Sequence, residues 1–480
     1  MKTTQPLRKA PFSTFWGNKQ FYLSVLAIAI PIALQNAVSN FVGLLDNIMI
    51  GQIGTEQMTG VSIVNQLHSV YYLCVFGVVS GAGLFTAQFY GKRNMSGVCQ
   101  TIRFKLICTL LLCAGTATLL LACQEPLIRM YLRSESQSVN PELTLYYAKE
   151  YLSVILFSLV PTALSQVYSS TLRECGSPVL PMVGSTSAVC INGLLNYILI
   201  FGKLGIPAMG VRGAALATVI SRFSELAIVF VWAHIHIAKY PFLKGLYRPA
   251  KIDGSLAKRI LVTGFPVFAD ISLWSVAQTL LLRCYSERGL AGISALNISN
   301  TFNDTASVLC MSFGSALAII LGQLLGAGKQ KEAKETAPKL ITLALLSGIA
   351  TGLVVFSCSF FFPNIYNTTE EVKGLATVLM KIVAVFVPVH AYANATYYTL
   401  RSGGKTIVTF IFNSGYAWLG SLPIVFCVTR FTGLSLPMVY LCYDAVEFTK
   451  CILGTILVRK GTWAITLTEN SENSVSGEHL

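Results

Sequence analysis

Polar and small residues recur along the first apolar segment of the chain. Steps of three, one, three, three and one residues separate Asn36, Ser39, Asn40, Gly43, Asp46 and Asn47. Such steps place the residues on one face of a helix. A carboxylate at membrane depth costs ~2.5–3.5 kcal/mol, so Asp46 should face protein or trapped water, where it could exchange a proton or a cation. The alternative is that Asp46 caps the helix end beside Gly51 and Gly54.

Similar polar stripes recur in other apolar segments. Spacings of three and four residues relate the members of four sets: Ser62, Asn65 and Ser69; Asp270, Trp274 and Gln278; Asn297, Asn300, Asp304 and Ser307; and His390, Asn394 and Tyr397. Their recurrence predicts a solvated cavity for a substrate. We expect this cavity to be lined by Asn36, Asn40, Asn65, Asp270, Asn300, Asp304, His390, Asn394 and Tyr397. For any single member, packing between polar helices explains the pattern equally well.

The elements that carry these residues are long apolar helices. The 480 residues are 54% hydrophobic and 12% charged, against about 25% charged in an average soluble domain. A helix needs ~20 apolar residues to cross the hydrocarbon of a membrane. We therefore expect an all-α integral membrane protein with twelve spans, at 22–49, 60–86, 104–122, 146–170, 179–201, 211–236, 259–282, 294–321, 339–362, 375–400, 406–428 and 434–458. The first span shows no small-residue cleavage pattern of a signal peptide and should be retained.

The distribution of basic residues predicts the orientation of the spans. With the N-terminus inside, the cytoplasmic segments hold 23 Lys and Arg residues and the outer loops hold nine. This bias places both termini in the cytoplasm of a multi-pass plasma-membrane protein. The net charge of +14 is thus explained by topology, and no basic patch with interleaved aromatic residues points to nucleic acid. The thirteen cysteines lie mostly in apolar spans without CxxC spacing and are expected to be apolar fillers.

The chain also contains an internal repeat. A shift of 235 residues pairs Pro31 with Pro266, Gly54 with Gly289, Ile63 with Ile298, Asn65 with Asn300, Ser80 with Ser315, Gln88 with Gln323 and Gly91 with Gly326. The repeat predicts two six-helix lobes that enter the membrane in the same direction. A cleft between the lobes would be a natural transport path. We expect an N-terminal segment at 1–20, an N-lobe at 21–238, a cytoplasmic connector at 239–258, a C-lobe at 259–458 and a C-terminal tail at 459–480.

Several motifs in this order resemble the multidrug and toxic compound extrusion (MATE) family of exporters. They are LLDNIMIGQIG at 44–54, AQFYGKRN at 87–94 with its partner GQLLGAGK at 322–329, LREC-G at 172–176, and NGLLNYILIFGKLGIPAMGVRGAALAT at 192–218. The resemblance covers nearly the whole chain. It implies two pseudo-symmetric six-helix lobes around a central cavity, and antiport of lipophilic, often cationic compounds against protons or sodium.

The resemblance also implies a coupling site in the N-lobe, at Asp46, Asn192, Asn196 and Thr218. A sodium ion would bind at Asp46, Asn192 and Asn196, although some relatives carry an aspartate where this chain has Asn196, which favours protons here. Hydrogen bonding between helices, worth about 0.6–2 kcal/mol, is the alternative role for the two asparagines. In the C-lobe, Trp274 and His390 stand where the NorM-like branch has cation-binding carboxylates. His390 could itself titrate near neutral pH.

Motifs for other chemistry are missing from the sequence. It contains no P-loop, HExxH or GxSxG motif, and no GxGxxG between a strand and a helix, so we expect neither an enzyme nor a cofactor other than the coupling ion, H⁺ or Na⁺. The function expected is export of small organic, amphipathic and often cationic compounds by alternating access, from a monomer in the lipid bilayer. A lipid-linked saccharide flippase is the second hypothesis, and a membrane scaffold or receptor the third.

Overall fold

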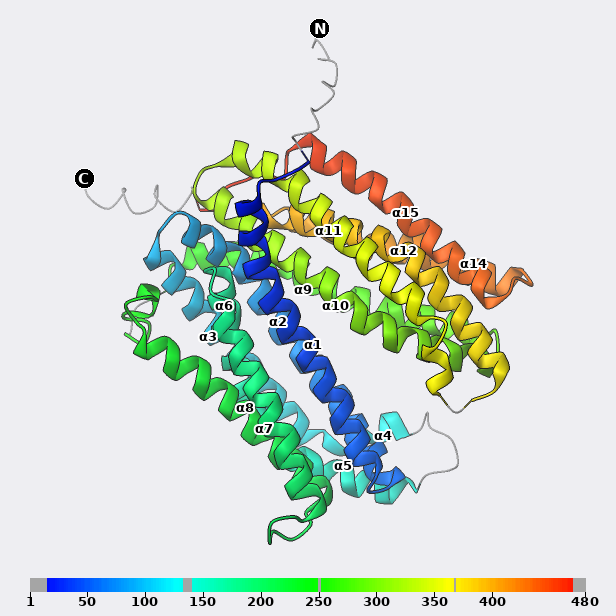
Figure 1. The fold of residues 1–480 in the computed structure, drawn as a ribbon. Coiled ribbons are helices and arrows are strands. Elements are labelled where there is room, and N and C mark those ends of the chain that lie inside the picture. Colours follow the sequence, from blue (N-terminus) through cyan, green and yellow to red (C-terminus); the bar gives the residue numbers. More distant parts are fainter. Residues whose placement is uncertain (1–14, 133–139, 249–251, 367, 469–480) are drawn as a thin grey trace. The chain divides into compact units, whose positions relative to one another are not determined.

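The computed structural model describes residues 15–132, 140–248, 252–366 and 368–468, and leaves out the side chains of 41–45, 47, 48, 290 and 304–306. Helices make up nearly all of this described part, and no strand occurs in it (Figure 1). The predicted fold class, an all-α integral membrane protein of two lobes, is confirmed.

Twelve helical segments of membrane length follow one another in the part of the chain that the structure describes. Ten are single helices: α1 (Lys19–Gly51), α2 (Thr55–Gly91), α3 (Met95–Ala122), α7 (Val179–Phe201), α8 (Gly210–Ile235), α9 (Gly254–Ser286), α10 (Leu290–Gly326), α11 (Gln330–Cys358), α12 (Glu370–Ser402) and α15 (Leu436–Lys460). Two are composite: α5 (Pro141–Ile155) with α6 (Leu159–Glu174), and α13 (Thr406–Phe410) with α14 (Leu422–Phe431). A short helix, α4 (Gln124–Leu132), lies in a predicted loop.

The composite segments have identifiable local causes. A 3₁₀ turn at Leu156–Ser158 joins α5 to α6, and Pro161 follows within the first turn of α6. Proline has no N–H to offer the carbonyl four residues earlier, which favours such a change of winding. Between α13 and α14 the chain takes two π-helical turns, Ile411–Gly415 and Ala417–Ser421, ahead of Pro423.

Within the described residues, eleven segments are long and apolar enough to cross a membrane. The twelfth, α15, has the length but carries Asp444, Glu447 and Lys450 near its middle. Most helices extend beyond their predicted spans. Helix α2, for example, begins at Thr55 and ends at Gly91, although its apolar run was expected only at 60–86. The reason is that a helix continues into the polar membrane surface, where hydropathy no longer marks it.

The described chain divides into two compact units. The first, the N-lobe unit, comprises Pro31–Val276, Thr406–Ser414 and the chain from Leu467 onward. The second, the C-lobe unit, comprises the chain up to Ile30, Ala277–Lys405 and Gly415–Thr466. The chain passes between the units inside α1, inside α9, before and after Thr406–Ser414, and before Leu467. The lobe limits expected from the sequence stay a prediction.

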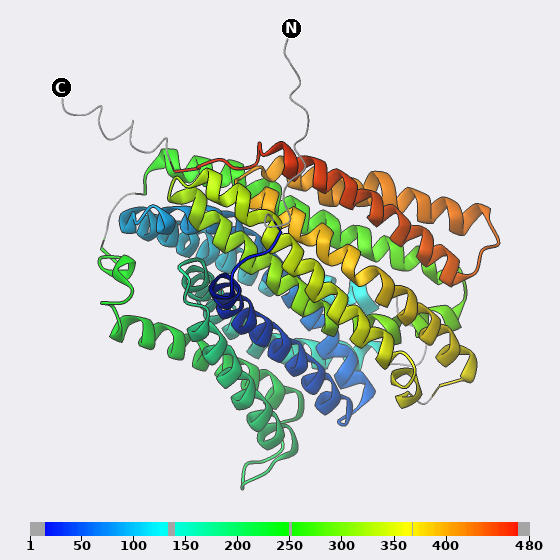
Figure 2. The same ribbon diagram turned by 45° about the horizontal axis from the view of Figure 1, so that its top comes forward.

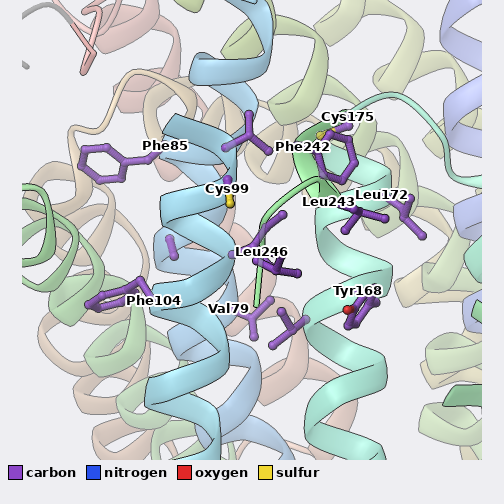
Figure 3. Close-up of a cluster of buried hydrophobic side chains, with 14 of the residues drawn as sticks. Val79, Phe85, Cys99, Phe104, Tyr168, Leu172, Cys175, Phe242, Leu243 and Leu246 are labelled. Carbon is purple, nitrogen blue, oxygen red and sulfur yellow. The ribbon is translucent and has the colours of Figure 1, made fainter. Parts of the chain in front are cut away.

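The N-lobe unit has its largest apolar core around α2, α3 and α6 (Figure 3). The segment after α8 contributes to this core, because Phe242, Leu243 and Leu246 are buried there. Arg103 fixes the same segment by donating hydrogen bonds from Nε to the carbonyl of Leu246, 2.9 Å, and from a terminal nitrogen to that of Gly245, 2.5 Å. The predicted connector is therefore packed against the N-lobe helices over this stretch.

A buried ion pair joins α3 to α6 within the same unit. Lys105 Nζ lies 2.6 Å from Glu174 Oε2, and the side chain of Lys105 is fully buried. Breaking such a pair from one side leaves an uncompensated charge, which typically costs ~3–5 kcal/mol. The pair therefore ties these two helices strongly.

Helix α9 begins at a capped N-terminus outside the apolar span. Asp253 precedes the helix, and its carboxylate accepts hydrogen bonds from the backbone N–H of Ser255, 2.9 Å, and from the Ser255 hydroxyl, 2.7 Å. Both bonds lower the pKa of Asp253 below its usual value, and the bond from the Ser255 hydroxyl has the larger effect. The cap is present at neutral pH and is lost as the pH falls through this lowered pKa.

The C-lobe unit is built on α10, α11, α12 and α15. Helix α12 packs against the other three, and they run side by side in both views (Figures 1 and 2). Apolar side chains such as Leu321, Leu325 and Leu340 fill the core, together with Val25 of the first turns of α1. Trp463, after the end of α15, is also buried there.

Candidate functional site

Three helices of the N-lobe unit, α1, α7 and α8, bring the four predicted coupling residues together. Asn196 on α7 donates from Nδ2 to Oδ1 of Asp46 on α1, and to Oδ1 of Asn192 at 3.1 Å. Asn192 in turn donates to the hydroxyl of Thr218 on α8, at 3.3 Å. The three helices thus form one continuous chain of polar contacts that starts at the carboxylate.

This chain of contacts is enclosed by protein. Asn192 is 3% exposed and Asn196 is 1% exposed, while Asp46 is only partly buried. The Oδ1 atom of Asn196 is buried and has no hydrogen-bond partner. A buried acceptor without a partner is costly, so the site offers an oxygen that a proton donor or a cation would satisfy.

Glycines set the close approach of α7 to α8 that the site requires. A Cβ on Gly213 would lie 2.6 Å from the carbonyl oxygen of Leu199, and one on Gly184 would lie 2.6 Å from a methyl group of Val229. Small residues at such contacts let helix backbones approach within a membrane. Gly202 caps the end of α7 in the left-handed conformation, with φ 67°, so the chain can turn back into α8.

A tyrosine that the sequence did not single out joins the predicted cavity residue Asn65. The hydroxyl of Tyr151 on α5 donates to Oδ1 of Asn65 on α2 at 3.3 Å. Nothing in the sequence marks Tyr151, because its neighbours in α5 follow an ordinary amphipathic pattern. Its role depends on the packing of α5 against α2, which brings the Tyr151 hydroxyl to Asn65.

A second polar network lies on α1, α7 and α8. Gln35 donates to Ser185 at 2.8 Å, and Ser185 donates to Glu225 at 2.6 Å. Glu225 also pairs with Arg222, three residues earlier on α8, at 2.9 Å. From α6, Arg173 donates to Gln35 at 3.0 Å. Nothing in the sequence marks Gln35 and Ser185 as partners, because they are separated by 150 residues.

A small polar cavity of about 20 Å³ lies beside this network. Three hydroxyls on α6, those of Thr162, Ser165 and Ser169, are each 3% exposed and have no hydrogen-bond partner. Gln166 and Gln35 complete the lining with the Arg222–Glu225 pair. The volume is enough for one water molecule, which would satisfy these hydroxyls.

Other cavity residues predicted from the sequence lie elsewhere. In the N-lobe unit, Asn36 is half-buried and Asn40 is exposed on α1. Asp270 on α9 is 1% exposed, and its carboxylate accepts from the backbone N–H and hydroxyl of Ser414 and from the amide of Asn413. Asp270 therefore joins α9 to the π-helical turn of the eleventh span, within the N-lobe unit.

The C-lobe unit holds the remaining predicted residues. His390 Nε2 lies 3.1 Å from Oδ1 of Asp444 on α15, and Tyr397 accepts a long hydrogen bond of 3.5 Å from Arg401. Asn300 on α10 and Asn394 on α12 are both half-buried. The side chain of Asp304 lies outside the described residues. Whether these residues line a substrate cavity stays a prediction.

The N-lobe contacts suit the exchange of a proton or a hard monovalent cation. Asp46 supplies a negative charge, and Asn192, Asn196 and Thr218 supply neutral oxygens, the ligand type that hard cations prefer. Among the described residues, no three His, Cys, Asp or Glu side chains gather as a metal site. A transition-metal centre would need such a group.

An all-α fold with many helices of membrane length is typical of a membrane transporter, and comparisons with known proteins name its family. The model of the MatE family matches residues 31–198 and 266–427, and the chain therefore belongs to this family of multidrug efflux transporters, which are not enzymes. The two matches begin 235 residues apart, at Pro31 and Pro266, which is the offset of the internal repeat.

Curated relatives of the chain are named multidrug resistance proteins. The probable multidrug resistance protein NorM of Thermotoga maritima is 24% identical over 439 residues, which cover 92% of each chain. The probable multidrug resistance protein YoeA of Bacillus subtilis is 22% identical over 94% of this chain and 96% of its own. These long, even alignments show that the likeness extends through both lobes.

Solved structures show the same fold. A multidrug resistance MATE family transporter of the MOP superfamily, in an outward-facing conformation, matches with a TM-score of 0.82 at 18% identity, over 96% of this chain and 98% of its own. A MATE in the straight conformation also matches with a TM-score of 0.82, over 91% of this chain and 95% of its own. At such identities the likeness concerns the fold alone.

Proposed function

We propose that this chain is a secondary active antiporter that exports small amphipathic, often cationic compounds in exchange for protons or sodium ions. The observation that supports the proposal most is the buried chain of contacts from Asp46 through Asn196 and Asn192 to Thr218. Family membership supports the efflux of drug-like compounds, and the curated relatives carry names of that kind.

The coupling follows from competition for one negative charge. When Asp46 is ionised, its negative charge is unbalanced, which is unfavourable at membrane depth. A bound cationic compound balances this charge, so the ionised site favours such a compound. A proton or sodium ion arriving from outside neutralises the carboxylate and releases the compound. Alternating access then requires one further condition. The inward-open and outward-open states must differ in their relative affinity for the cationic compound and for the coupling ion.

The single carboxylate makes a proton the better candidate for the coupling ion. Asn196 stands beside Asp46 and contributes a neutral oxygen, so one negative charge would have to balance a sodium ion. A proton needs only the carboxylate itself. We further propose that the protein works as a monomer in the cell membrane with both termini in the cytoplasm, as its basic residues indicate.

Replacement of Asp46 tests the proposal. The Asp46→Asn variant is reconstituted into proteoliposomes, and ethidium transport is followed under an imposed pH gradient and, separately, under an imposed sodium gradient. We expect the variant to transport ethidium no faster than protein-free liposomes under either gradient. The wild type should respond to the pH gradient.

The matched control is Asp253→Asn, the same chemical change at an exposed cap outside the spans. It should keep transport at the wild-type rate. Gradient-driven transport by a correctly folded Asp46→Asn protein would rule out the role of this carboxylate.

A further inference from the structure

Helix α6 presents hydroxyl groups to the small polar cavity of the N-lobe unit. Thr162, Ser165 and Ser169 are spaced by three and four residues, so they share one face of the helix. Each is 3% exposed, and within the described residues none of the three hydroxyls has a hydrogen-bond partner, not even a backbone carbonyl of its own helix. A buried hydroxyl without a partner is costly. Three of them on one face indicate that the cavity receives a hydrogen-bond acceptor.

The positive charge beside this cavity exceeds the negative charge. Arg222 and Glu225 line the cavity and pair with each other at 2.9 Å, so their charges cancel. Arg173 lies four residues after Ser169 on the same face of α6, and it donates to Gln35, another lining residue, at 3.0 Å. Gln35 is neutral, and Arg173 forms no ion pair with any residue that the structure describes. The positive charge of Arg173 is therefore left over.

Neighbouring groups do not remove this charge. Glu174 follows Arg173 directly, but its carboxylate pairs with Lys105 of α3 at 2.6 Å. Tyr72 and His68 of α2 also face the arginines, and neither brings a negative charge at neutral pH. The side chains of α1 that the structure leaves out are all uncharged.

Asp46 decides whether the network as a whole is balanced. Arg222 lies four residues after Thr218 on α8, one turn from the coupling site, and interacts electrostatically with the Asp46 carboxylate. While Asp46 is ionised, it and Glu225 balance the two arginines. When a proton or a cationic compound neutralises Asp46, one positive charge remains. An unbalanced charge within a membrane span is unfavourable, so this state calls for an anion.

The volume of the cavity limits which anion can enter. It is about 20 Å³, which is enough for one particle of about the size of water. A halide ion is of that order, whereas a carboxylate or phosphate group has several heavy atoms and is too large. Hydroxyl and guanidinium groups can both donate hydrogen bonds to such an ion. A water molecule would satisfy the hydroxyls but would leave the charge unbalanced.

We propose that this cavity binds one small monovalent anion, such as chloride, when Asp46 is neutralised. The three hydroxyls of α6 and the guanidinium of Arg222 donate to the anion, and the excess charge of Arg173 attracts it. The anion keeps the N-lobe unit neutral while the coupling site carries a proton or a cationic compound. The inference deepens the proposed exchange at Asp46 and rests on it, but it concerns a different ligand at a different set of side chains.

Binding of radioactive chloride measures the site directly. The purified protein in detergent is dialysed against ³⁶Cl⁻ at constant ionic strength, with gluconate as the replacement anion. We expect Asp46→Asn, in which the carboxylate is permanently neutral, to bind one chloride per molecule, and bromide to displace it. The wild type at about pH 8, where a carboxylate of ordinary pKa is ionised, should bind chloride at least tenfold more weakly.

Variants of the cavity test which side chains hold the anion. In the Asp46→Asn background, Arg173→Gln should weaken chloride binding at least tenfold, because it removes the excess charge. Ser169→Ala should also weaken binding, by a smaller factor, because it removes one donor. The matched control is Arg129→Gln, the same change at a half-exposed arginine of α4 that pairs with Glu125 and Glu142. It should leave chloride binding unchanged.

The outcomes separate this site from the coupling site. Absence of saturable chloride binding in Asp46→Asn, or binding that Arg173→Gln and Ser169→Ala both leave intact, overturns the proposal. Equal affinities in Asp46→Asn and the wild type overturn the dependence on Asp46. Should Arg173→Gln fail to fold, Ser169→Ala, which removes a single oxygen atom, decides the result. No transport is measured, so a failure of the ethidium test at Asp46 would leave a chloride site with these properties standing.

Discussion

Asn196 is the residue that decides how much negative charge the N-lobe site holds. Its amide donates to Asp46 and to Asn192, and its own oxygen is left buried without a partner. An aspartate at this position would place a second carboxylate next to the first. Two carboxylates balance a bound cation better than one, because attraction grows as the dielectric falls inside protein.

We expect Asn196→Asp to make transport respond to sodium. The added carboxylate should let a sodium gradient drive ethidium transport at least tenfold faster than in the wild type, equivalent to about 1.4 kcal/mol of improved coupling. The measurement is ethidium transport in proteoliposomes under a sodium gradient at constant pH. The control is Asn40→Asp, the same change at an exposed position of α1.

Equal sodium responses in Asn196→Asp and Asn40→Asp would show that carboxylate number at this site does not select the ion. The proton preference proposed for the wild type would then need another cause.

Individual site residues were predictable from the sequence only where their chemistry is unusual for their surroundings. Asp46 could be found because a carboxylate in an apolar span is conspicuous, and the motif at 192–218 pointed to Asn192 and Asn196. Tyr151 and Gln35 could not, because each acts through a partner on another helix, 86 and 150 residues away. Such pairs depend on how the helices pack, which hydropathy does not encode.

At the scale of elements, the contact between α7 and α8 holds the site in register. Asn192 and Asn196 lie on one helix and Thr218 on the other, so their hydrogen bonds depend on the close approach at Gly213. A Cβ there would overlap the carbonyl of Leu199 at 2.6 Å. The same addition at Gly193 of α7 would meet nothing within 4 Å.

Alanine at these two glycines should therefore have opposite effects on stability. Gly193→Ala should stabilise the protein by up to ~1 kcal/mol, because alanine favours the helix. Gly213→Ala should destabilise it by ~1–3 kcal/mol, because overpacking forces the two helices apart. The measurement is thermal unfolding of the purified proteins in detergent, with ethidium transport as the second readout.

A Gly213→Ala protein as stable and as active as Gly193→Ala would mean that α7 and α8 tolerate a wider separation. The chain of hydrogen bonds from Asp46 would then not depend on this contact.

Helices were predictable to the extent that their apolar runs reveal them. All twelve predicted spans correspond to helical segments in the described part of the chain, and eleven of these segments are long and apolar enough to cross a membrane. The helix α4 lies in a predicted loop, since nine residues are too few to show in a window the length of a span. The π-helical turns of the eleventh span also escaped prediction, because hydropathy does not distinguish them from an α-helix. One of them contains Asn413 and Ser414, which donate hydrogen bonds to Asp270.

For the whole molecule, the repeat proved to be the most informative feature of the sequence. Seven identities at one offset predicted two equivalent halves, and the family model begins its two matches at the same offset. The repeat does not make the halves chemically equal. The carboxylate of the N-lobe site is on the first span, whereas the contact between His390 and Asp444 in the C-lobe unit involves the last.

The orientation of the whole chain in the membrane is the remaining prediction. The segments expected on the cytoplasmic side hold 23 Lys and Arg residues and the opposite loops nine, and such a bias fixes the side on which each loop stays during insertion. Twelve spans bring the two termini to the same side. Green fluorescent protein fused after Leu480 should therefore fluoresce in bacteria, whereas alkaline phosphatase fused there should be inactive.

Phosphatase fused within the loop between α3 and α5 should show the opposite behaviour and be active, because that loop belongs to the outer set. A truncation after α11, with an odd number of spans, provides the control and should reverse the two reporters. An active phosphatase after Leu480 of the full chain would invert the assignment of every loop. The direction of exchange would still be set by the ion gradient, but protons from outside would reach Asp46 through the opposite face of the chain.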